Sequence, residues 1–305
     1  DPTNPVIGEI WYNTTIGVLK GYQTVAAAWA SGGNLNNARA GVGSTGPTTD
    51  TAFAFGGNNG PSGNSEQYNG TSWTEVGDLA TARSYLAGAG TQTAGLGFGG
   101  YQGPPNRFLN LSEEYNGSSW AEGNNLNTGR DVLAGCGTQT AGLAFGGFTP
   151  GDTGATEEYN GTSWSEQNDL NTARRGLSGA GTQTAGLAMA GNVGPNSNLT
   201  EEYDGTSWTT SNTLNTGREG VGSAGIQTSA IAMGGSIPPN TTAVEQYNGT
   251  SWTTGVSLTV SRDSAGGAGA SSTSALVFGG RAPSPTTATE EFTDTFNAAR
   301  TLTTS

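Results

Sequence analysis

Short apolar stretches alternate with polar turns along the chain, and one polar-aromatic pattern recurs in near-identical form. Its most constant part is an eight-residue segment, EEYNGTSW in one copy, that contains an Asn-Gly or Asp-Gly pair between a tyrosine and a tryptophan. The copies occupy residues 66–73, 113–120, 157–164, 201–208 and 245–252. Asn-Gly and Asp-Gly accept the positive φ values of a type I′ turn, so each copy predicts a β-hairpin with the tryptophan on the returning strand.

The spacing of these hairpins predicts a repeat architecture. Their tyrosines, Tyr68, Tyr115, Tyr159, Tyr203 and Tyr247, are separated by 47, 44, 44 and 44 residues. A degraded copy follows at Glu290-Glu291-Phe292, and Trp29 lies 44 residues before Trp73. A period of 40–50 residues in a glycine-rich and aromatic-rich β sequence is typical of propeller blades.

One unit contains four predicted strands, which we letter A to D in chain order. In the fourth unit they cover residues 174–181, 187–191, 199–203 and 206–210. Strand B ends in a small-residue pair in every unit: Gly56-Gly57, Gly99-Gly100, Gly146-Gly147, Ala190-Gly191, Gly234-Gly235 and Gly279-Gly280. A Gly-Gly pair after an apolar strand, followed by a tyrosine and a tryptophan, resembles the kelch repeat. The resemblance covers residues 21–305 and implies an all-β, six-bladed β-propeller of four-stranded antiparallel blades, with repeats that start near residues 39, 83, 130, 174, 218 and 262.

The two ends of the chain are expected to close this ring. The segment from Tyr22 to Trp29 reads as a strand D without its own blade, whereas the last unit lacks a good strand D. We therefore expect this segment to form the outer strand of the sixth blade, with the tail 297–305 at the same seam. Closure removes the open sheet edges that promote aggregation.

Composition and charge exclude several classes of function. The 305 residues carry a net charge of −13 with a single lysine, which disfavours binding to nucleic acid or to an anionic membrane. The sequence contains no stretch of 18 apolar residues, so it predicts no membrane-spanning helix. The chain has one cysteine, Cys136, and no histidine, so it has no internal disulfide, no typical zinc site and no histidine base. We expect no enzyme activity, no catalytic residue, no metal and no cofactor.

Twelve charged residues recur in register with the repeat. They are Arg39, Arg83, Arg130, Arg174, Arg218 and Arg262, with Glu66, Glu113, Glu157, Glu201, Glu245 and Glu290 two residues before each strand C aromatic. Equivalent positions in every blade favour a structural role, so we predict one Arg–Glu contact per blade or between blades. The functional alternative is an arginine cluster around the axis, as in sialidases.

The loops between strands B and C differ completely from unit to unit, whereas the A–B and C–D turns scarcely vary. Loops on a rigid scaffold are the usual place for recognition. The longest B–C loop covers 101–112 and contains Tyr101, Arg107 and Phe108, and the next blade offers Phe148 and Asp152. These five residues are the predicted ligand-binding site, in which aromatic rings and a few polar groups suit a sugar or a peptide.

Residues 4–22, with the sequence NPVIGEIWYNTTIGVLKGY, predict a β-hairpin. We expect residues 1–20 to form an attachment segment ahead of a propeller over residues 21–305. Residues 5–22 also carry a resemblance to known proteins. This segment is similar to the GEIWYNTTTG-type segments of bacteriophage tail-fibre and virion proteins, and the Thr-, Ser- and Asn-rich repeats resemble those of marine phage structural proteins. The resemblance implies a virion-associated, extracellular protein.

Three hypotheses of function remain open at this point. The first is a non-enzymatic propeller that binds a host-surface glycan or protein through its B–C loops. The second is a structural virion or fibre module that docks on other virion proteins or self-associates as a homo-oligomer. The third is a glycan-cleaving propeller, which needs two carboxylates in one pocket, such as Asp152 with a neighbour.

Overall fold

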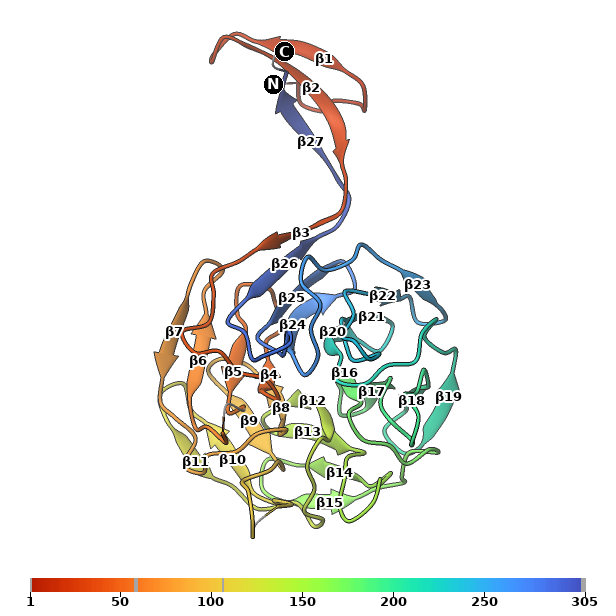
Figure 1. Cartoon of the computed structure of the whole chain (residues 1–305). Coiled ribbons are helices and arrows are strands. Elements are labelled where there is room, and N and C mark those ends of the chain that lie inside the picture. The colour runs from red at the N-terminus through yellow and green to blue at the C-terminus, as the bar shows by residue number, and fades with distance from the viewer. Residues whose placement is uncertain (1, 58–59, 106, 303–305) are drawn as a thin grey trace.

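Six four-stranded antiparallel sheets surround a common axis, and a separate three-stranded sheet extends from the rim (Figure 1). This computed structural model describes residues 2–57, 60–105 and 107–302. The predicted all-β, six-bladed propeller is confirmed. The described residues form no helix. They therefore contain no helix that could cross a membrane.

Each blade runs from an inner strand A to an outer strand D. The strands of blades 1 to 3 are β4 (Gly43–Thr45), β5 (Phe53–Phe55), β6 (Ser65–Tyr68) and β7 (Trp73–Val76); β8 (Ala87–Gly90), β9 (Gly95–Phe98), β10 (Ser112–Tyr115) and β11 (Trp120–Glu122); β12 (Ala134–Thr138), β13 (Ala141–Phe145), β14 (Thr156–Tyr159) and β15 (Trp164–Glu166). Those of blades 4 to 6 are β16 (Ser178–Thr182), β17 (Ala185–Met189), β18 (Thr200–Tyr203) and β19 (Trp208–Ser211); β20 (Gly222–Ile226), β21 (Ser229–Met233), β22 (Val244–Tyr247) and β23 (Trp252–Thr254); β24 (Gly266–Ser271), β25 (Ser274–Phe278), β26 (Thr289–Thr293) and β3 (Ala28–Ser31).

The N-terminal part of the chain closes the ring, as the sequence predicts, because β3 completes the sixth blade. The closing strand is shorter than expected, since the first half of the predicted segment from Tyr22 to Trp29 belongs to β2 (Val18–Val25) outside the blade. Trp29 of β3 lies opposite Phe292 of β26, and their ring centroids are 5.1 Å apart. The last blade therefore contains strands from both parts of the chain, so the ring is closed by hydrogen bonds of a sheet ladder.

The tail does not stay in this blade, contrary to expectation. β27 (Phe296–Thr301) pairs with β2 (Val18–Val25), and β1 (Ile10–Asn13) pairs with the other edge of β2. The pairs Thr293↔Ala28 and Phe296↔Val25 belong to one antiparallel register, interrupted only by the residues between them. The closing ladder thus continues beyond the blade into the outer sheet, and β2 crosses the expected boundary at residue 20. We call the sheet β1–β2–β27, with its adjoining residues, the stem.

The repeated motif builds the seams between blades. Each strand D tryptophan is buried and packs on strand B of the preceding blade, as Trp164 does on Phe98 at 5.0 Å between ring centroids. In five blades its indole N–H donates to a hydroxyl on strand C of that preceding blade: Trp73 to Thr289, Trp120 to Ser65, Trp164 to Ser112, Trp208 to Thr156 and Trp252 to Thr200. The motif is repeated because each seam requires the same apolar and polar contacts.

The asparagine of the motif shapes the turn itself. Asn160 Oδ1 accepts hydrogen bonds from the backbone N–H groups of Thr162 and Ser163, both at 2.9 Å. Gly161 of the same turn has a φ of +86°, a conformation that L residues with side chains rarely adopt. Asn160 does not have a positive φ, and four residues separate the paired Tyr159 and Trp164, so the predicted type I′ turn is wrong. The spelling Asn-Gly-Thr-Ser is therefore explained by a local Asx turn.

Candidate functional site

The six repeated arginines pair with the six repeated glutamates, each within its own blade. The Arg N to Glu Oε1 distances are 2.6 Å for Arg39–Glu66, 3.0 Å for Arg83–Glu113, 3.1 Å for Arg130–Glu157, 3.1 Å for Arg218–Glu245 and 2.6 Å for Arg262–Glu290, and Arg174 contacts Glu201 in the same way. All twelve side chains are at most 3% exposed. These pairs lie too deep to meet a ligand.

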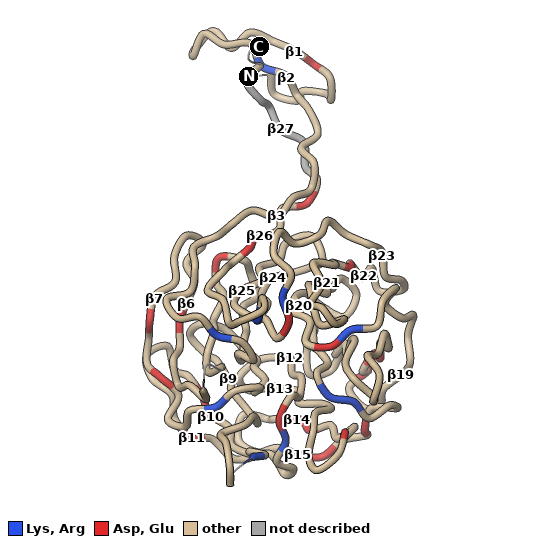
Figure 2. The backbone as a smooth tube through the Cα atoms, in the orientation of Figure 1, with Lys and Arg blue, Asp and Glu red and all other residues tan. Residues whose placement is uncertain are grey.

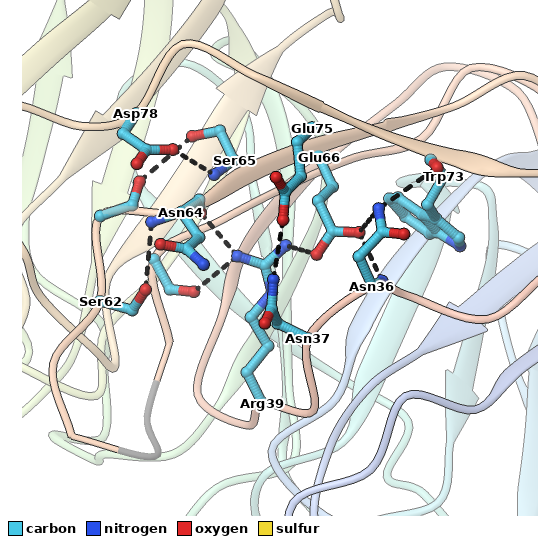
Figure 3. Close-up of polar contacts among 12 residues, drawn as sticks. Asn36, Asn37, Arg39, Ser62, Asn64, Ser65, Glu66, Trp73, Glu75 and Asp78 are labelled. Carbon is cyan, nitrogen blue, oxygen red and sulfur yellow. Dashed lines mark hydrogen bonds and ion pairs between the residues drawn. The ribbon is translucent and has the colours of Figure 1, made fainter.

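Figure 3 shows how the first pair is held. Arg39 donates to the carbonyl oxygen of Asn64 at 2.6 Å and to Glu66 Oε1 at 2.6 Å (Figure 3). The other oxygen, Oε2, accepts from the backbone N–H of Asn36 at 2.7 Å. The pair therefore ties the loop that enters strand A to strand C of the same blade, and satisfies buried backbone groups on both.

Burial disfavours the charged form of these arginines, and the facing glutamates oppose that effect. Burial lowers the pKa of Arg83 to about 10, although Glu113 raises it. The guanidinium therefore stays charged near neutral pH. None of the six arginines lines the axial cavity among the described residues, so they do not form the axial cluster considered as an alternative.

The axial cavity has a volume of about 460 Å³ and is lined mostly by the small residues of the A strands. Cys136 is one of these residues, and burial raises the pKa of its thiol to about 12. A thiol with so high a pKa is a poor nucleophile, so Cys136 serves as a small apolar residue between the inner strands. The described residues offer no cluster of three or more metal-ligating side chains.

A closed ring of six backbone hydrogen bonds surrounds the axis where the chain enters the A strands. The bonds run Tyr85 N to Gly41 O, Val132 N to Tyr85 O, Gly176 N to Val132 O, Gly220 N to Gly176 O, Ser264 N to Gly220 O and Gly41 N to Ser264 O, at 2.7–2.9 Å. All six residues have φ between +53° and +63°. This conformation costs free energy in Val132, whose side chain is β-branched. It also explains why β16 begins at Ser178 and not at the predicted residue 174.

Four of the five predicted ligand-binding residues come together beside this ring. The Phe108 and Phe148 ring centroids are 5.8 Å apart, with the rings edge to face. The Arg107 guanidinium carbon lies 5.2 Å from the Phe108 centroid and 5.6 Å from that of Phe148. Asp152 is joined to this group through Arg175, whose Nη1 is 2.6 Å from Asp152 Oδ1 and whose guanidinium carbon is 5.2 Å from the Phe148 centroid. We call Arg107, Phe108, Phe148, Asp152 and Arg175 the loop cluster.

Tyr101 belongs to the same blade as Arg107 but is held differently. Its backbone N–H and C=O pair with Ser84, at 2.7 and 2.9 Å. No ring contact joins Tyr101 to either phenylalanine in the part of the chain that the structure describes. The structure therefore places Tyr101 next to the loop cluster but not in it.

Two residues of this region were missed in the sequence: Arg175 and Asp131. Asp131 forms a backbone bridge with Phe148, which bridges in turn with Asp152. Asp131 is 4% exposed, and its Oδ1 has no hydrogen-bond partner among the described residues. Burial raises the pKa of this carboxyl group to about 6, against the lowering effect of Arg107 and Arg175.

A signal for both residues is present in the sequence. The position after each repeated arginine is variable: Ala40, Ser84, Asp131, Arg175, Glu219 and Asp263. A variable position beside a constant one marks the place where the D–A segment leaves the core and joins the B–C loops. The predicted strand A, which begins at the repeated arginine, includes this position.

A second cluster of polar side chains lies on the B–C loop face of the propeller, near the sixth blade. Arg281 donates to the Tyr85 hydroxyl at 2.7 Å, and its Nε is 4.0 Å from Asp263 Oδ1. Burial raises the pKa of Asp263 as well, with Arg281 opposing the shift. Because blades 3 and 6 lie on opposite sides of the axis, Asp131 and Asp263 do not form one site.

Comparisons with known proteins establish the fold and no family. No family model matches the chain, and no curated protein matches it. Among solved structures, 374 chains match, so the fold alone does not indicate a function. The structure of YjhT is one of these, with 13% identity and a TM-score of 0.69 over 88% of this chain and 99% of that chain. At this identity the similarity shows that both chains share the propeller fold.

Proposed function

We propose that this protein is a non-enzymatic binding module of a virus particle, and that it recognises an acidic host-surface polysaccharide through the loop cluster. The observation that carries this proposal is the position of Arg107. Its residue is exposed and its guanidinium lies over two phenylalanine rings, and no ion pair holds it within the described residues. A planar cation held on aromatic rings is ready to accept a carboxylate or sulfate with little loss of side-chain entropy.

The positions of the basic residues favour an anionic ligand. The chain has a net charge of −13, and nine of its eleven basic residues lie in the propeller. Six of these nine are the buried repeat arginines, which leaves Arg107, Arg175 and Arg281. Two of the three belong to the loop cluster, so this is the region of the propeller in which an anionic sugar meets accessible cations.

Binding is favoured over cleavage for a geometric reason. Glycoside hydrolysis requires two accessible carboxyl groups on either side of the scissile bond. Asp131 is the neighbour of Asp152 across Phe148, and its raised pKa suits a general acid. Its side chain, however, is almost entirely buried, and Asp152 already pairs with Arg175. Neither group is free to reach a sugar without rearrangement of the cluster.

The location on a virion rests on resemblance. The N-terminal segment resembles phage tail-fibre segments, and it forms most of the stem, which leaves the propeller at its rim beside β3 and β26 (Figure 1). A stem at the rim presents the propeller without covering the axis. A purely structural module remains the second candidate, because the C–D turns repeat one conformation and give other virion subunits a regular face to contact.

The experiment that tests the proposal is a glycan array probed with the full chain and with two matched variants, Arg107→Gln and Arg281→Gln. We expect binding to uronate-containing or sulfated polysaccharides, with at least a tenfold loss in Arg107→Gln and little change in Arg281→Gln, because one tenfold step is about 1.4 kcal/mol and charge-assisted hydrogen bonds contribute that much. Both substitutions remove one positive charge from the same face, from an exposed residue at Arg107 and from a half-buried one at Arg281.

Three outcomes would count against the proposal. An equal loss in both variants would indicate a general effect of charge. Binding to neutral glycans alone would remove the role of Arg107. No binding by the unmodified chain would favour the structural module.

A further inference from the structure

One face of the stem is rich in apolar residues, and its one charged position in the described ladder is Arg300, which pairs with Gly21 on the edge strand β27. In the ladder between β1 and β2, Ile10 lies opposite Gly21 and Tyr12 lies opposite Leu19. Paired residues and residues two apart share a face of a sheet. The backbone N–H of Leu302 donates to Leu19 O, and a Cβ on Gly21 would meet the Leu302 side chain at 3.3 Å, which extends the same face to a third strand.

This face is uncovered. Its four apolar side chains are among the most exposed large hydrophobic residues of the described chain: Ile10 61%, Tyr12 60%, Leu19 44% and Leu302 37%. Val6, Ile7 and Ile16 add three more within the stem, which gives seven of the eleven such residues in the described part of the chain. A monomeric protein rarely concentrates exposed apolar residues in this way, so the patch indicates an interaction surface.

The stem cannot cover this face itself. It has three strands and no second layer in the described residues, and a sheet this small needs another element against its apolar side. The propeller does not supply that element, because the stem extends away from the rim (Figure 1). The described residues therefore leave this face without a partner.

Charge points to a second copy of the same chain. Residues 1–27 and 296–305 contain Asp1, Glu9, Lys20 and Arg300, two acidic and two basic residues with a net charge of 0, so the whole net charge of −13 lies in residues 28–295. Figure 2 shows the acidic residues distributed over the blades. Two propellers repel each other at close range, whereas two stems meet without an electrostatic cost and keep the propellers apart.

We propose that the stem is a self-association site, in which the apolar face of one stem packs against the same face of a second copy. The contact is isologous, because the same apolar residues meet in both copies, and Arg300 lies on β27 at the edge of the sheet, outside the centre of the contact. The proposal does not depend on the ligand of the loop cluster. It also gives each particle-bound unit more than one propeller, which increases avidity for a repetitive polymer.

The test is sedimentation equilibrium of the full chain over a concentration series, with Tyr12→Lys and Leu19→Lys as stem variants. The matched control is Ile226→Lys, since Ile226 is 48% exposed but lies on the propeller. We expect the unmodified chain and Ile226→Lys to have at least twice the monomer mass, and both stem variants to have the monomer mass. Most of the tryptophan fluorescence should be unchanged in all variants, because six of the seven tryptophans are buried in the blades and Trp11 alone lies in the stem.

A mixing experiment separates loss of the contact from local unfolding of the stem. Tyr12→Lys and Tyr12→Glu should each be monomeric alone and should associate when mixed, since opposite charges replace the apolar contact. The proposal is overturned if the unmodified chain is monomeric at every concentration, if the stem variants keep the mass of the unmodified chain, or if the mixture stays monomeric.

Discussion

Arg174 and Arg175 are consecutive in the sequence and differ in almost every physical respect. The Arg174 side chain is fully buried and pairs with Glu201, and an arginine recurs at this position in all six blades. The Arg175 side chain is 35% exposed and pairs with Asp152, and the other five blades have other residues at this position. The comparison teaches that the propeller uses one position for stability and the next for variation, at the point where the chain leaves the core.

The largest effect is expected at the buried position. Arg174→Met leaves Glu201 buried without its partner, which should lower the free energy of unfolding by about 3–5 kcal/mol. Urea unfolding followed by tryptophan fluorescence measures this loss. Arg175→Met is the matched control and should cost about 0–1 kcal/mol, because its ion pair is near the surface.

The double variant Arg174→Met, Glu201→Met sharpens the interpretation. It removes both buried charges and should recover part of the stability lost in the single variant, because the backbone groups that Arg174 and Glu201 satisfy still lose their partners. Equal losses in Arg174→Met and Arg175→Met would show that the contrast between the two positions is not energetic.

The next effect concerns Asp131, the carboxyl group beneath the loop cluster. Because burial raises its pKa from 3.8 to about 6, the folded protein keeps a proton that the unfolded chain has lost in this interval. The contribution of Asp131 to stability therefore falls as the pH rises from about 4 to about 6 and is constant above that range. The difference in unfolding free energy between the protein and Asp131→Asn, measured at several pH values, should show this slope, and a flat difference would contradict the raised pKa.

A smaller effect on the free energy of unfolding is expected from the tyrosine hydroxyl groups at the contacts between blades. The Tyr203 hydroxyl donates to Glu158 of the preceding blade at 2.9 Å, whereas the buried Tyr115 hydroxyl has no partner among the described residues. At the position of Glu158 the first blade has Gln67, whose side chain donates instead to Gln92 O. Tyr203→Phe should therefore cost about 1 kcal/mol, and Tyr115→Phe should cost nothing or stabilise slightly.

Thermal unfolding of both variants under one condition is sufficient for this comparison. The sixth blade supports the expectation, because Phe292 replaces the tyrosine where Gln246 of the preceding blade replaces the glutamate. A loss in Tyr115→Phe as large as that in Tyr203→Phe would show that the hydroxyl contact does not distinguish the seams.

The sequence was sufficient for the propeller because its seams are made by side chains. Trp164 needs an apolar neighbour and a hydroxyl at fixed places, and Asn160 needs its turn, so the same letters recur in each unit. The clustering of Arg107 with Phe108 and Phe148 was also anticipated, because loops of neighbouring blades meet on one face.

Features made by the backbone were not predictable in this way. The axial ring uses N–H and C=O groups, which every residue has, and only three of its six positions are glycine. Tyr85, Val132 and Ser264 adopt the same positive φ without any mark in the sequence. Likewise, pairing of β2 with β27 depends on the register of the closing ladder and not on residue type.

The shared register of the closing blade and the stem has a mechanical consequence. The strands β2 and β27 enter the sixth blade side by side as β3 and β26, so any load on the propeller reaches the stem through both strands at once. Forces that pull the two strands apart break the ladder one pair at a time, beginning in the stem. Forces that pull both strands in the same direction leave every pair intact, and a propeller held by both strands resists drag on its ligand without opening its ring.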